Sequence, residues 1–310
     1  MRGNNNLFLR VGFYLLVFFH CYHLSLVAAF SNSQPQVPKV VQELHDAQGG
    51  PYAFCQQTEL LETMEEDTVD EWYPTTRTLF EFTTLNNVKN ATKAQFCIRE
   101  TSFGCGGLGY CVWSSAVALG LTLLQHPQWI HNRRVLELGA GCGLPSRLCW
   151  ELGAAAVLAT DFWEQPDTPT ERKDVVPDPL HALNLQYNTQ TAVQRVDWND
   201  LETVRQAQAI FQPDIILGSD LVYYPVNVQP LLDTLQELLP LENNPKSAQF
   251  AVLMSPLPPD HEREGLPEFR QRLPQVLPHH AIDMHEVTLV RPQMNGKKER
   301  FLRTIITRQN

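Results

Sequence analysis

Short apolar runs typical of buried strands alternate with helix-like segments through the second half of the chain, and this alternation constrains the fold most. The strand-like runs are residues 135–138, 155–161, 192–198, 214–220 and 250–255. Segments with helical spacing lie between them, at 145–152, 179–188 and 230–239. Because parallel neighbouring strands need a crossover connection, this order predicts an α/β fold with a doubly wound, mostly parallel sheet covered by helices on both faces.

Strand-like runs also flank this central pattern. Residues 77–85 and 94–100 alternate apolar and polar side chains around a polar turn, which predicts a hairpin as a small N-terminal β extension. Residues 285–291 and 300–308 predict a C-terminal antiparallel hairpin. We find no internal repeat and no second core, so we assign one domain to residues 77–310.

The first residues are kept apart from the fold. Residues 1–29 hold an apolar run that ends in small residues before Phe30, which predicts a cleaved signal for the secretory route. The alternative is an uncleaved signal anchor, the one segment that would place the protein on a membrane. Residues 30–76 are first polar and then acidic, and we interpret them as a presequence or acidic linker that is partly disordered. The polar part resembles the two-part presequences that lead into complex plastids.

Charge and cysteine usage limit the partners. The formal net charge is -10 and no Lys/Arg-rich run occurs, which argues against a nucleic-acid partner and favours a protein or small-molecule substrate. The seven cysteines form no CxxC pair and no Cys/His ligand spacing, so no metal site is predicted. We expect reduced cysteines and a monomer, with disulfides as the alternative in a secreted chain.

A glycine-rich turn follows the strand at 135–138. Gly139, Gly141 and Gly143 leave the backbone bare where doubly wound sheets bind nucleosides. Their GxGxG spacing is one residue shorter than the dinucleotide pattern GxGxxG, which needs a longer cradle for its pyrophosphate. A sulfonium nucleoside has no phosphate to cradle. Asp161 ends the next strand, where a carboxylate can accept hydrogen bonds from ribose hydroxyls; its alternative role is an ordinary turn or cap residue.

Four motifs together resemble a known family. They are ELGAGCGLPS at 137–146, ATD at 159–161, VDWND at 196–200 and ILGSDLVYYP at 216–225. They look like the seven-strand S-adenosylmethionine methyltransferases of family 16, which include many protein-lysine methyltransferases. The resemblance runs from about Gly104 to Leu239. It implies a Rossmann-like class I methyltransferase fold, S-adenosyl-L-methionine as cofactor, and a protein lysine as methyl acceptor.

The resemblance also assigns the candidate site residues. The cofactor-binding set is Trp113, Glu137, Gly139, Gly141, Gly143, Asp161, Trp198 and Asp220. The residues expected to act on the acceptor are Asp220 and Tyr223, from the D-x-x-Y signature. A carboxylate at Asp220 can attract and orient a cationic amine, and Tyr223 or Tyr224 can face the same nitrogen. The alternatives are a turn cap for Asp220 and a purely packed ring for Trp198.

Methyl transfer to lysine requires an uncharged amine, since an ammonium with a pKa of about 10.4 has no lone pair. A partly dry, aromatic pocket favours proton loss, whereas a carboxylate opposes it, so we expect Asp220 to place the amine. Residues 163–179 and the proline-rich segment MSPLPPDHEREG depart from the family pattern. A small-molecule N- or O-methyltransferase and a catalytically inactive binding module therefore stay open as alternatives.

Overall fold

The structure is a computed structural model. It describes residues 40–45, 53–60, 75–84, 92–101, 108–163, 179–239, 248–259 and 263–309. The signal predicted at 1–29 and most of the linker predicted at 30–76 lie outside the described residues, as does the greater part of the insertion at 163–179. No helix in the described ranges is both long and apolar enough to cross a bilayer.

Five parallel strands, named the central strands, form one end of the eleven-stranded sheet. They are β5 (Arg134–Leu138), β6 (Ala156–Asp161), β7 (Ala192–Arg195), β8 (Ile215–Ser219) and β9 (Phe250–Pro256), in the spatial order β9-β8-β5-β6-β7. Each run predicted as a strand between residues 135 and 255 is confirmed. The third of them is shorter than expected, because β7 ends at Arg195 and residues 196–198 belong to the following loop.

Antiparallel strands extend the sheet from β9. They are β11 (Lys297–Arg308), β10 (His280–Arg291), β1 (Val40–His45), β2 (Ala53–Leu60), β3 (Thr75–Thr84) and β4 (Lys93–Thr101), in that order. Both predicted hairpins are confirmed, as β3–β4 and β10–β11. No strand is predicted within 30–76, yet β1 and β2 lie there.

The expectation of a mostly parallel sheet is wrong for the sheet as a whole, because among the eleven described strands only β5 to β9 are parallel neighbours. The physical reason lies in the connections. The central strands are joined through helices, which return the chain to the same end of the sheet. Most terminal strands follow one another through short connections, which favour antiparallel pairing. The strands β1 and β10 pair although they are far apart in the sequence, and they too run antiparallel. The sheet is therefore mixed, within an α/β fold.

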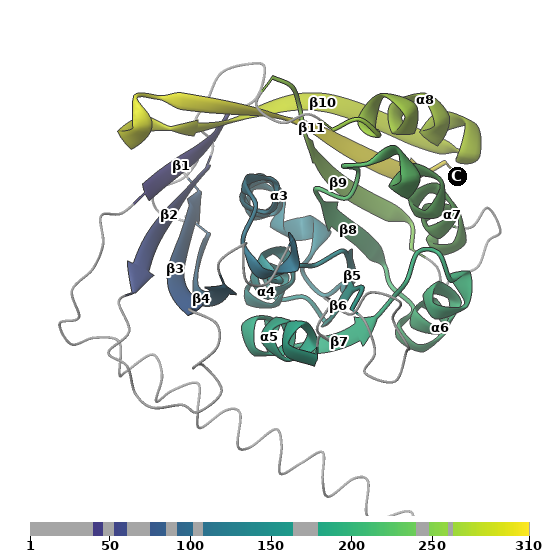
Figure 1. The fold of residues 1–310 in the computed structure, drawn as a ribbon, viewed down its shortest axis with the longest axis horizontal. Coiled ribbons are helices and arrows are strands. Elements are labelled where there is room, and N and C mark those ends of the chain that lie inside the picture. The colour runs from purple at the N-terminus through teal and green to yellow at the C-terminus, as the bar shows by residue number, and fades with distance from the viewer. Residues whose placement is uncertain are drawn as a thin grey trace, which may run out of the picture.

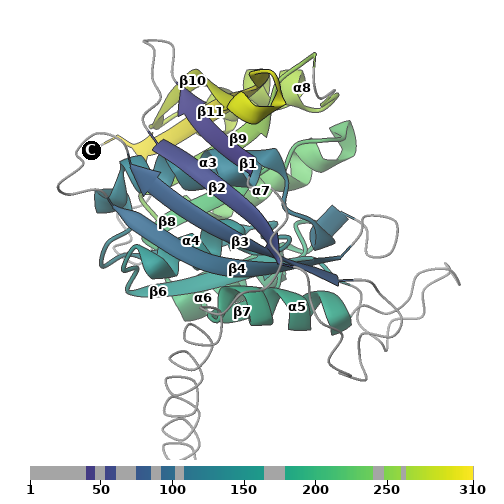
Figure 2. The same cartoon turned by 90° about the vertical axis from the view of Figure 1, so that its left-hand side faces the viewer.

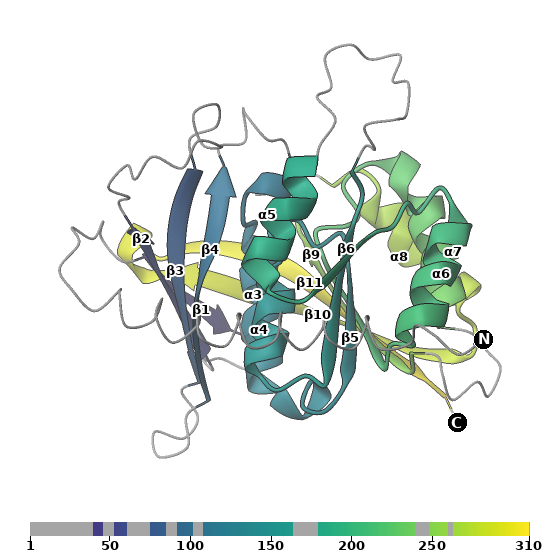
Figure 3. The same cartoon turned by 90° about the horizontal axis from the view of Figure 1, so that it is seen from below.

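Helices cover both faces of the central strands (Figure 1). On one face lie α3 (Ser114–Gln125), α4 (Leu144–Glu151) and α5 (Pro179–Thr189). On the other lie α6 (Leu201–Phe211), α7 (Val228–Leu238) and α8 (Leu266–Val276). The sheet curves so that β1 to β4 stand on the far side of α3 and α4, and Figures 2 and 3 show these helices enclosed between the N-terminal and central strands.

An aromatic cluster joins the N-terminal strands to the helices. The rings of Phe80, Phe82 and Phe96 stack with centroids 5.8 to 6.4 Å apart. All three are buried in one core with α3, α4 and the central strands. A Cβ at Gly120 of α3 would lie 3.1 Å from Phe82, so glycine allows this close approach. Burial of each ring contributes about 2 to 3 kcal/mol, and β1 to β4 therefore share the core of the domain.

Candidate active site

A cavity of about 500 Å³ opens at the carboxyl ends of β5, β6 and β8, where doubly wound sheets bind ligands. Its walls also include the segment before α3 and Arg263, which precedes α8. The structure brings these sequence-predicted residues together around it: Trp113, Gly139, Gly141, Gly143, Asp161, Trp198, Asp220 and Tyr223. Residues from five separate segments of the chain thus share one site.

The glycine turn has left-handed backbone at all three glycines, with φ of 56°, 53° and 77°. Two of them are required by the protein itself. A Cβ at Gly143 would lie 2.3 Å from Thr189, and one at Gly139 would lie 2.7 Å from Leu221. Gly141 differs, since its Cβ would meet only backbone atoms of Gly109 at 3.7 Å or more. Gly141 is therefore the glycine that leaves open space along the cavity.

Glu137 lies beneath this turn and is 0% exposed, so it does not appear among the described residues that line the cavity. Its carboxylate accepts hydrogen bonds from the Ser146 backbone nitrogen at 2.8 Å and from the Ser146 hydroxyl at 2.5 Å. Burial raises the pKa of Glu137 to about 8, against the opposing effect of these two bonds. Glu137 thus ties β5 to the first turn of α4.

Asp161 ends β6 and faces the glycine turn. One carboxylate oxygen accepts a hydrogen bond from the Gly141 nitrogen at 2.6 Å, and the other accepts from the Phe162 nitrogen at 2.7 Å. The His181 imidazole of α5 lies 3.3 Å from the first oxygen and is buried. His181 was missed by the sequence reasoning, although a histidine within an otherwise apolar helical run was a usable signal.

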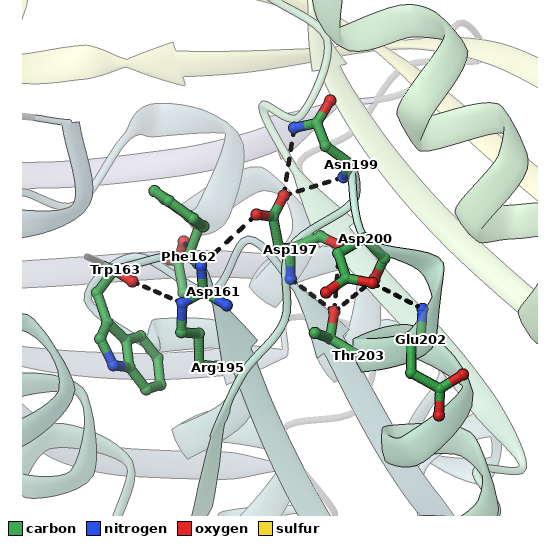
Figure 4. Close-up of polar contacts among 9 residues, drawn as sticks. All are labelled: Asp161, Phe162, Trp163, Arg195, Asp197, Asn199, Asp200, Glu202 and Thr203. Carbon is green, nitrogen blue, oxygen red and sulfur yellow. Dashed lines mark hydrogen bonds and ion pairs between the residues drawn. The ribbon is translucent and has the colours of Figure 1, made fainter. Parts of the chain in front are cut away.

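The loop after β7 carries a polar network next to the cavity (Figure 4). Asp197 accepts a hydrogen bond from the Asn199 nitrogen at 2.9 Å, and its other oxygen lies 3.5 Å from the Arg195 guanidinium. Thr203 donates its hydroxyl hydrogen to the Asp197 carbonyl and accepts from the Asp197 nitrogen. Because both backbone groups of Asp197 are held, the next residue, Trp198, is presented to the cavity.

The N-terminal strands position the segment 108–113, which lines the cavity and is called its lip. Glu100 of β4 accepts hydrogen bonds from the Val112 nitrogen at 2.7 Å and from the Thr78 hydroxyl at 2.9 Å. Burial raises the pKa of Glu100. Next to Val112, Trp113 precedes α3 and donates its indole N–H to the Leu108 carbonyl at 2.9 Å. The strand β4, which comes earlier in the chain, therefore holds this lip through a hydrogen bond.

Asn188 of α5 links the same strand to the glycine turn. Its amide oxygen accepts from the Arg99 nitrogen at 2.8 Å, and its amide nitrogen donates to the Arg99 carbonyl at 2.9 Å. The same nitrogen donates to the Cys142 carbonyl at 3.0 Å, inside the turn. Asn188 is buried, and nothing in the local sequence marked it out.

Asp220 follows β8 in a left-handed conformation with φ of 56°, which is uncommon outside glycine. Its nitrogen donates to the Met254 carbonyl of β9 at 2.9 Å. Arg263 grips its carboxylate with two parallel hydrogen bonds, both of 2.8 Å. Arg263 was not predicted as a site residue, although it lies in the proline-rich segment that departs from the family pattern.

Two tyrosines follow Asp220 at the mouth of the cavity. The rings of Tyr223 and Tyr224 meet edge to face, with centroids 5.1 Å apart. Burial raises the pKa of Tyr223, so its hydroxyl keeps its proton at neutral pH. Tyr224 is 58% exposed and also lines the cavity. The pair therefore forms an aromatic wall that continues to the surface.

Residues 91–255, more than half of the chain, match the model of a family described as lysine methyltransferase. The chain belongs to the lysine methyltransferase family. The family resemblance drawn from the four motifs is thereby confirmed. The matched range contains the glycine turn, Asp161, Trp198 and Asp220, and it ends before Arg263.

Three curated proteins are similar to this chain over part of their length. The protein N-terminal and lysine N-methyltransferase efm7 of Neurospora crassa is 27% identical over 47% of this chain and 53% of its own. The human protein-lysine N-methyltransferase EEF2KMT is 28% identical over 47% of this chain and 45% of its own. The histone-arginine methyltransferase METTL23 of Rattus norvegicus is 30% identical over 51% of this chain and 64% of its own. The chain thus spans about half the length of the relatives it matches.

Proposed function

We propose that this protein is an S-adenosyl-L-methionine-dependent methyltransferase that acts on a lysine side chain of another protein. One observation carries the proposal: Asp161 and Asp220 line the same cavity, which the glycine turn and the two tyrosines also line. Asp161 accepts a hydrogen bond from Gly141 of that turn. A site with a nucleoside end and an amine end matches the two partners of such a reaction. Membership in the lysine methyltransferase family supports the same assignment.

The cofactor end fits a sulfonium nucleoside. Asp161 would accept hydrogen bonds from the ribose hydroxyls, and the Trp198 indole would lie against the adenine with Asp197 near its exocyclic amine. Gly141 leaves the space that such a ligand needs along the turn. When bound, the cofactor supplies an electrophilic methyl group. Glu137 would act from below the turn by holding α4, without contact to the ligand.

The acceptor end orients an amine. Asp220 and the rings of Tyr223 and Tyr224 can hold the nitrogen of the acceptor within about 3 to 3.5 Å of the methyl group, which is the main demand of a direct displacement. No covalent intermediate on the protein is needed. The tyrosine wall and Trp113 limit the water around the reacting atoms.

A protein acceptor fits the mouth better than a small molecule. Leu108, Phe162 and Tyr224 are all exposed large side chains that line the cavity. Small ligands are usually enclosed over 70% or more of their surface, whereas an open apolar rim suits a side chain that enters from a polypeptide. The names of the relatives include lysine, N-terminal and arginine acceptors, and the exposed rim supports a protein acceptor of this kind.

The test is incubation of the purified protein with methyl-labelled cofactor and a protein extract from its own cells. We expect a labelled protein band whose acid hydrolysate contains the label in methylated lysine. Label confined to the metabolite fraction would replace the proposal with a small-molecule methyltransferase. Absence of cofactor binding in calorimetry would replace it with an inactive binding module.

We also propose that residues 1–29 direct the chain into the secretory route and are removed, with onward transport to a plastid as the destination suggested by the polar segment after Phe30. N-terminal sequencing of the native protein tests this. A first residue at Phe30 supports cleavage after Ala29. A native chain that starts at the initiator methionine and sediments with membranes supports the signal-anchor alternative.

A further inference from the structure

The acceptor end of the cavity holds a paired charge where a bare carboxylate was expected. Both oxygens of Asp220 face Arg263, one 2.8 Å from its Nε and the other 2.8 Å from a terminal guanidinium nitrogen. The two side chains are 11% and 16% exposed, and both line the cavity. Paired carboxylate and guanidinium groups in this geometry bind strongly and compensate each other's charge.

Arg263 is brought to this position by packing as well as by charge. Gly265, two residues later, is the N-cap of α8, and a Cβ at Gly265 would lie 2.8 Å from the carbonyl oxygen of Tyr224. The next residue, Leu266, is buried in the core. The start of α8 is therefore pressed against the loop that carries Asp220, and the guanidinium is held close to the carboxylate.

The charge at Asp220 decides which form of the acceptor amine the site prefers. A bare carboxylate within about 4 to 6 Å favours the charged form of an amine. Transfer needs the uncharged form, because the nitrogen lone pair forms the new N–C bond while the C–S electron pair stays on sulfur. The product nitrogen then carries the positive charge and loses a proton to water. A bare Asp220 would bind the acceptor well in its unreactive form.

We propose that Arg263 is a positioning residue that neutralises Asp220, so that the carboxylate orients the acceptor amine without stabilising its ammonium form. This inference rests on the proposed function, because it assigns a charge preference to the acceptor end of that site. It makes Arg263, which lies beyond the range matched by the family, a determinant of how this chain handles a basic acceptor.

Other titratable groups near the pair are few within the described part of the chain. Tyr223 and Tyr224 face Arg263 from the loop after β8, and burial keeps the hydroxyl of Tyr223 protonated by raising its pKa. Asp161 on β6 and Asp197 in the loop after β7 also line the cavity, as do Cys111 and Cys142. Burial raises the pKa of both thiols, so they stay uncharged at neutral pH. Among the described residues that line the cavity, Arg263 alone carries a positive charge.

A purely structural ion pair is the competing explanation, and the charge preference separates the two. The probe is n-butylamine, which copies the end of a lysine side chain and is almost fully protonated at pH 7. Its affinity is measured by nuclear magnetic resonance titration, with and without S-adenosylhomocysteine. The variants are Arg263→Gln, Arg263→Lys and the double variant Asp220→Asn/Arg263→Gln. Arg272→Gln serves as the matched control, because Arg272 lies on α8, the helix that follows Arg263, and pairs with Glu268 at the surface.

Arg263→Gln should bind n-butylammonium roughly tenfold more tightly at pH 7, since it leaves Asp220 bare toward the cavity. Arg263→Lys and Arg272→Gln should bind it as the unchanged protein does. The double variant should lose the gain. An Arg263→Gln protein that is folded, as judged by its circular dichroism, and binds the amine no more tightly overturns the proposal.

The second measurement follows methyl transfer to a pool of nine-residue peptides with a central lysine, between pH 6.5 and 9.5. For Arg263→Gln we expect a lower apparent KM, a maximal rate reduced roughly tenfold at pH 7, and recovery as pH rises by about one unit or more. Equal losses at every pH would indicate a structural role and contradict the inference. A failure of the proposed function looks different: the unchanged protein would bind no S-adenosylhomocysteine or transfer no label, whatever the amine titration gives.

Discussion

The carboxylate of Asp161 and the backbone nitrogen of Gly141 lie 2.6 Å apart, and the hydrogen bond between them joins the end of β6 to the turn after β5. The residue expected to hold the ribose therefore also holds the turn that borders the ligand. Charged hydrogen bonds of this kind are worth about 1.5 to 3 kcal/mol. Cofactor affinity and turn geometry are coupled through one side chain.

Asp161→Ala should weaken S-adenosyl-L-methionine binding by about 10-fold to 100-fold, because the ribose contact and the support of Gly141 are lost together. Isothermal titration calorimetry measures the change. Asp200→Ala is the control, since Asp200 caps α6 through the Glu202 nitrogen and does not line the cavity. The control should lose about 1 kcal/mol of stability and keep its cofactor affinity. Equal affinities in both variants would remove Asp161 from the cofactor site.

Alanine substitutions at Gly143 and Gly141 should differ in their effects on stability and on cofactor binding. Gly143→Ala meets Thr189 at 2.3 Å and also strains a φ of 77°, so we expect it to lower the free energy of unfolding by at least about 3 kcal/mol. Gly141→Ala has open space, and the strain alone should cost about 1 to 2 kcal/mol. Its main effect should be weaker cofactor binding. Urea unfolding and calorimetry on both variants check the order, and a reversed order contradicts the assignment.

Asn188→Ala should destabilise the protein by about 2 to 4 kcal/mol, because it leaves the Arg99 nitrogen and the Cys142 carbonyl without this partner. It should also weaken cofactor binding through the turn. Asn184→Ala is a matched control on the same helix, where a single bond to the Arg99 carbonyl is 3.4 Å long. Thermal unfolding and calorimetry compare the two. Similar losses in both would mean that Asn188 does not link strand and turn.

Glu137 should make stability depend on pH. Burial raises its pKa from 4.5 to about 8 in the folded protein, so between these values the native state binds more protons than the unfolded state. The contribution of this group is fully present below about pH 4.5 and is lost as pH rises to about 8. The loss amounts to something on the order of 3 to 5 kcal/mol.

Glu137→Gln keeps an acceptor for both Ser146 bonds and cannot ionise, so its unfolding free energy should fall less between pH 5 and 8 than that of the unchanged protein. Urea titrations across this range measure both slopes. Glu151→Gln, on the helix that carries Ser146, removes a partly exposed carboxylate that pairs with Arg147, and it should keep the original slope. Identical slopes in all three proteins would show that Glu137 stays ionised in the fold.

Much of the site follows from local sequence. Gly139, Gly141 and Gly143 adopt left-handed backbone that disfavours side chains, and Asp161 comes where an apolar run ends, so both features can be read without a structure. The strands β1 and β2 escaped prediction because they lie in a segment whose acidic composition resembles a linker. Both strands are antiparallel and only partly buried, and antiparallel strands with one face toward solvent need fewer apolar residues, so their signal is weak.

The partners of the site residues could not be predicted in the same way. Arg263 and Asp220 are 43 residues apart, and Asn188 and Arg99 are 89 apart. A chain with many arginines and asparagines offers no local sign of which one meets a given carboxylate or carbonyl. His181 and Glu100 contact Asp161 and the Val112 nitrogen, respectively, from elements that the motifs do not include.

The sequence by itself determined the α/β order of the central strands, the glycine turn around Gly141, and the acids at the end of β6 and directly after β8, because periodicity and backbone conformation are properties of neighbouring residues. Only the tertiary structure decided that Glu137 supports the turn from below, that Asn188 links β4 to the turn, and that Arg263 pairs with Asp220. These contacts depend on how the curved sheet and its helices pack, which brings distant residues within hydrogen-bond distance.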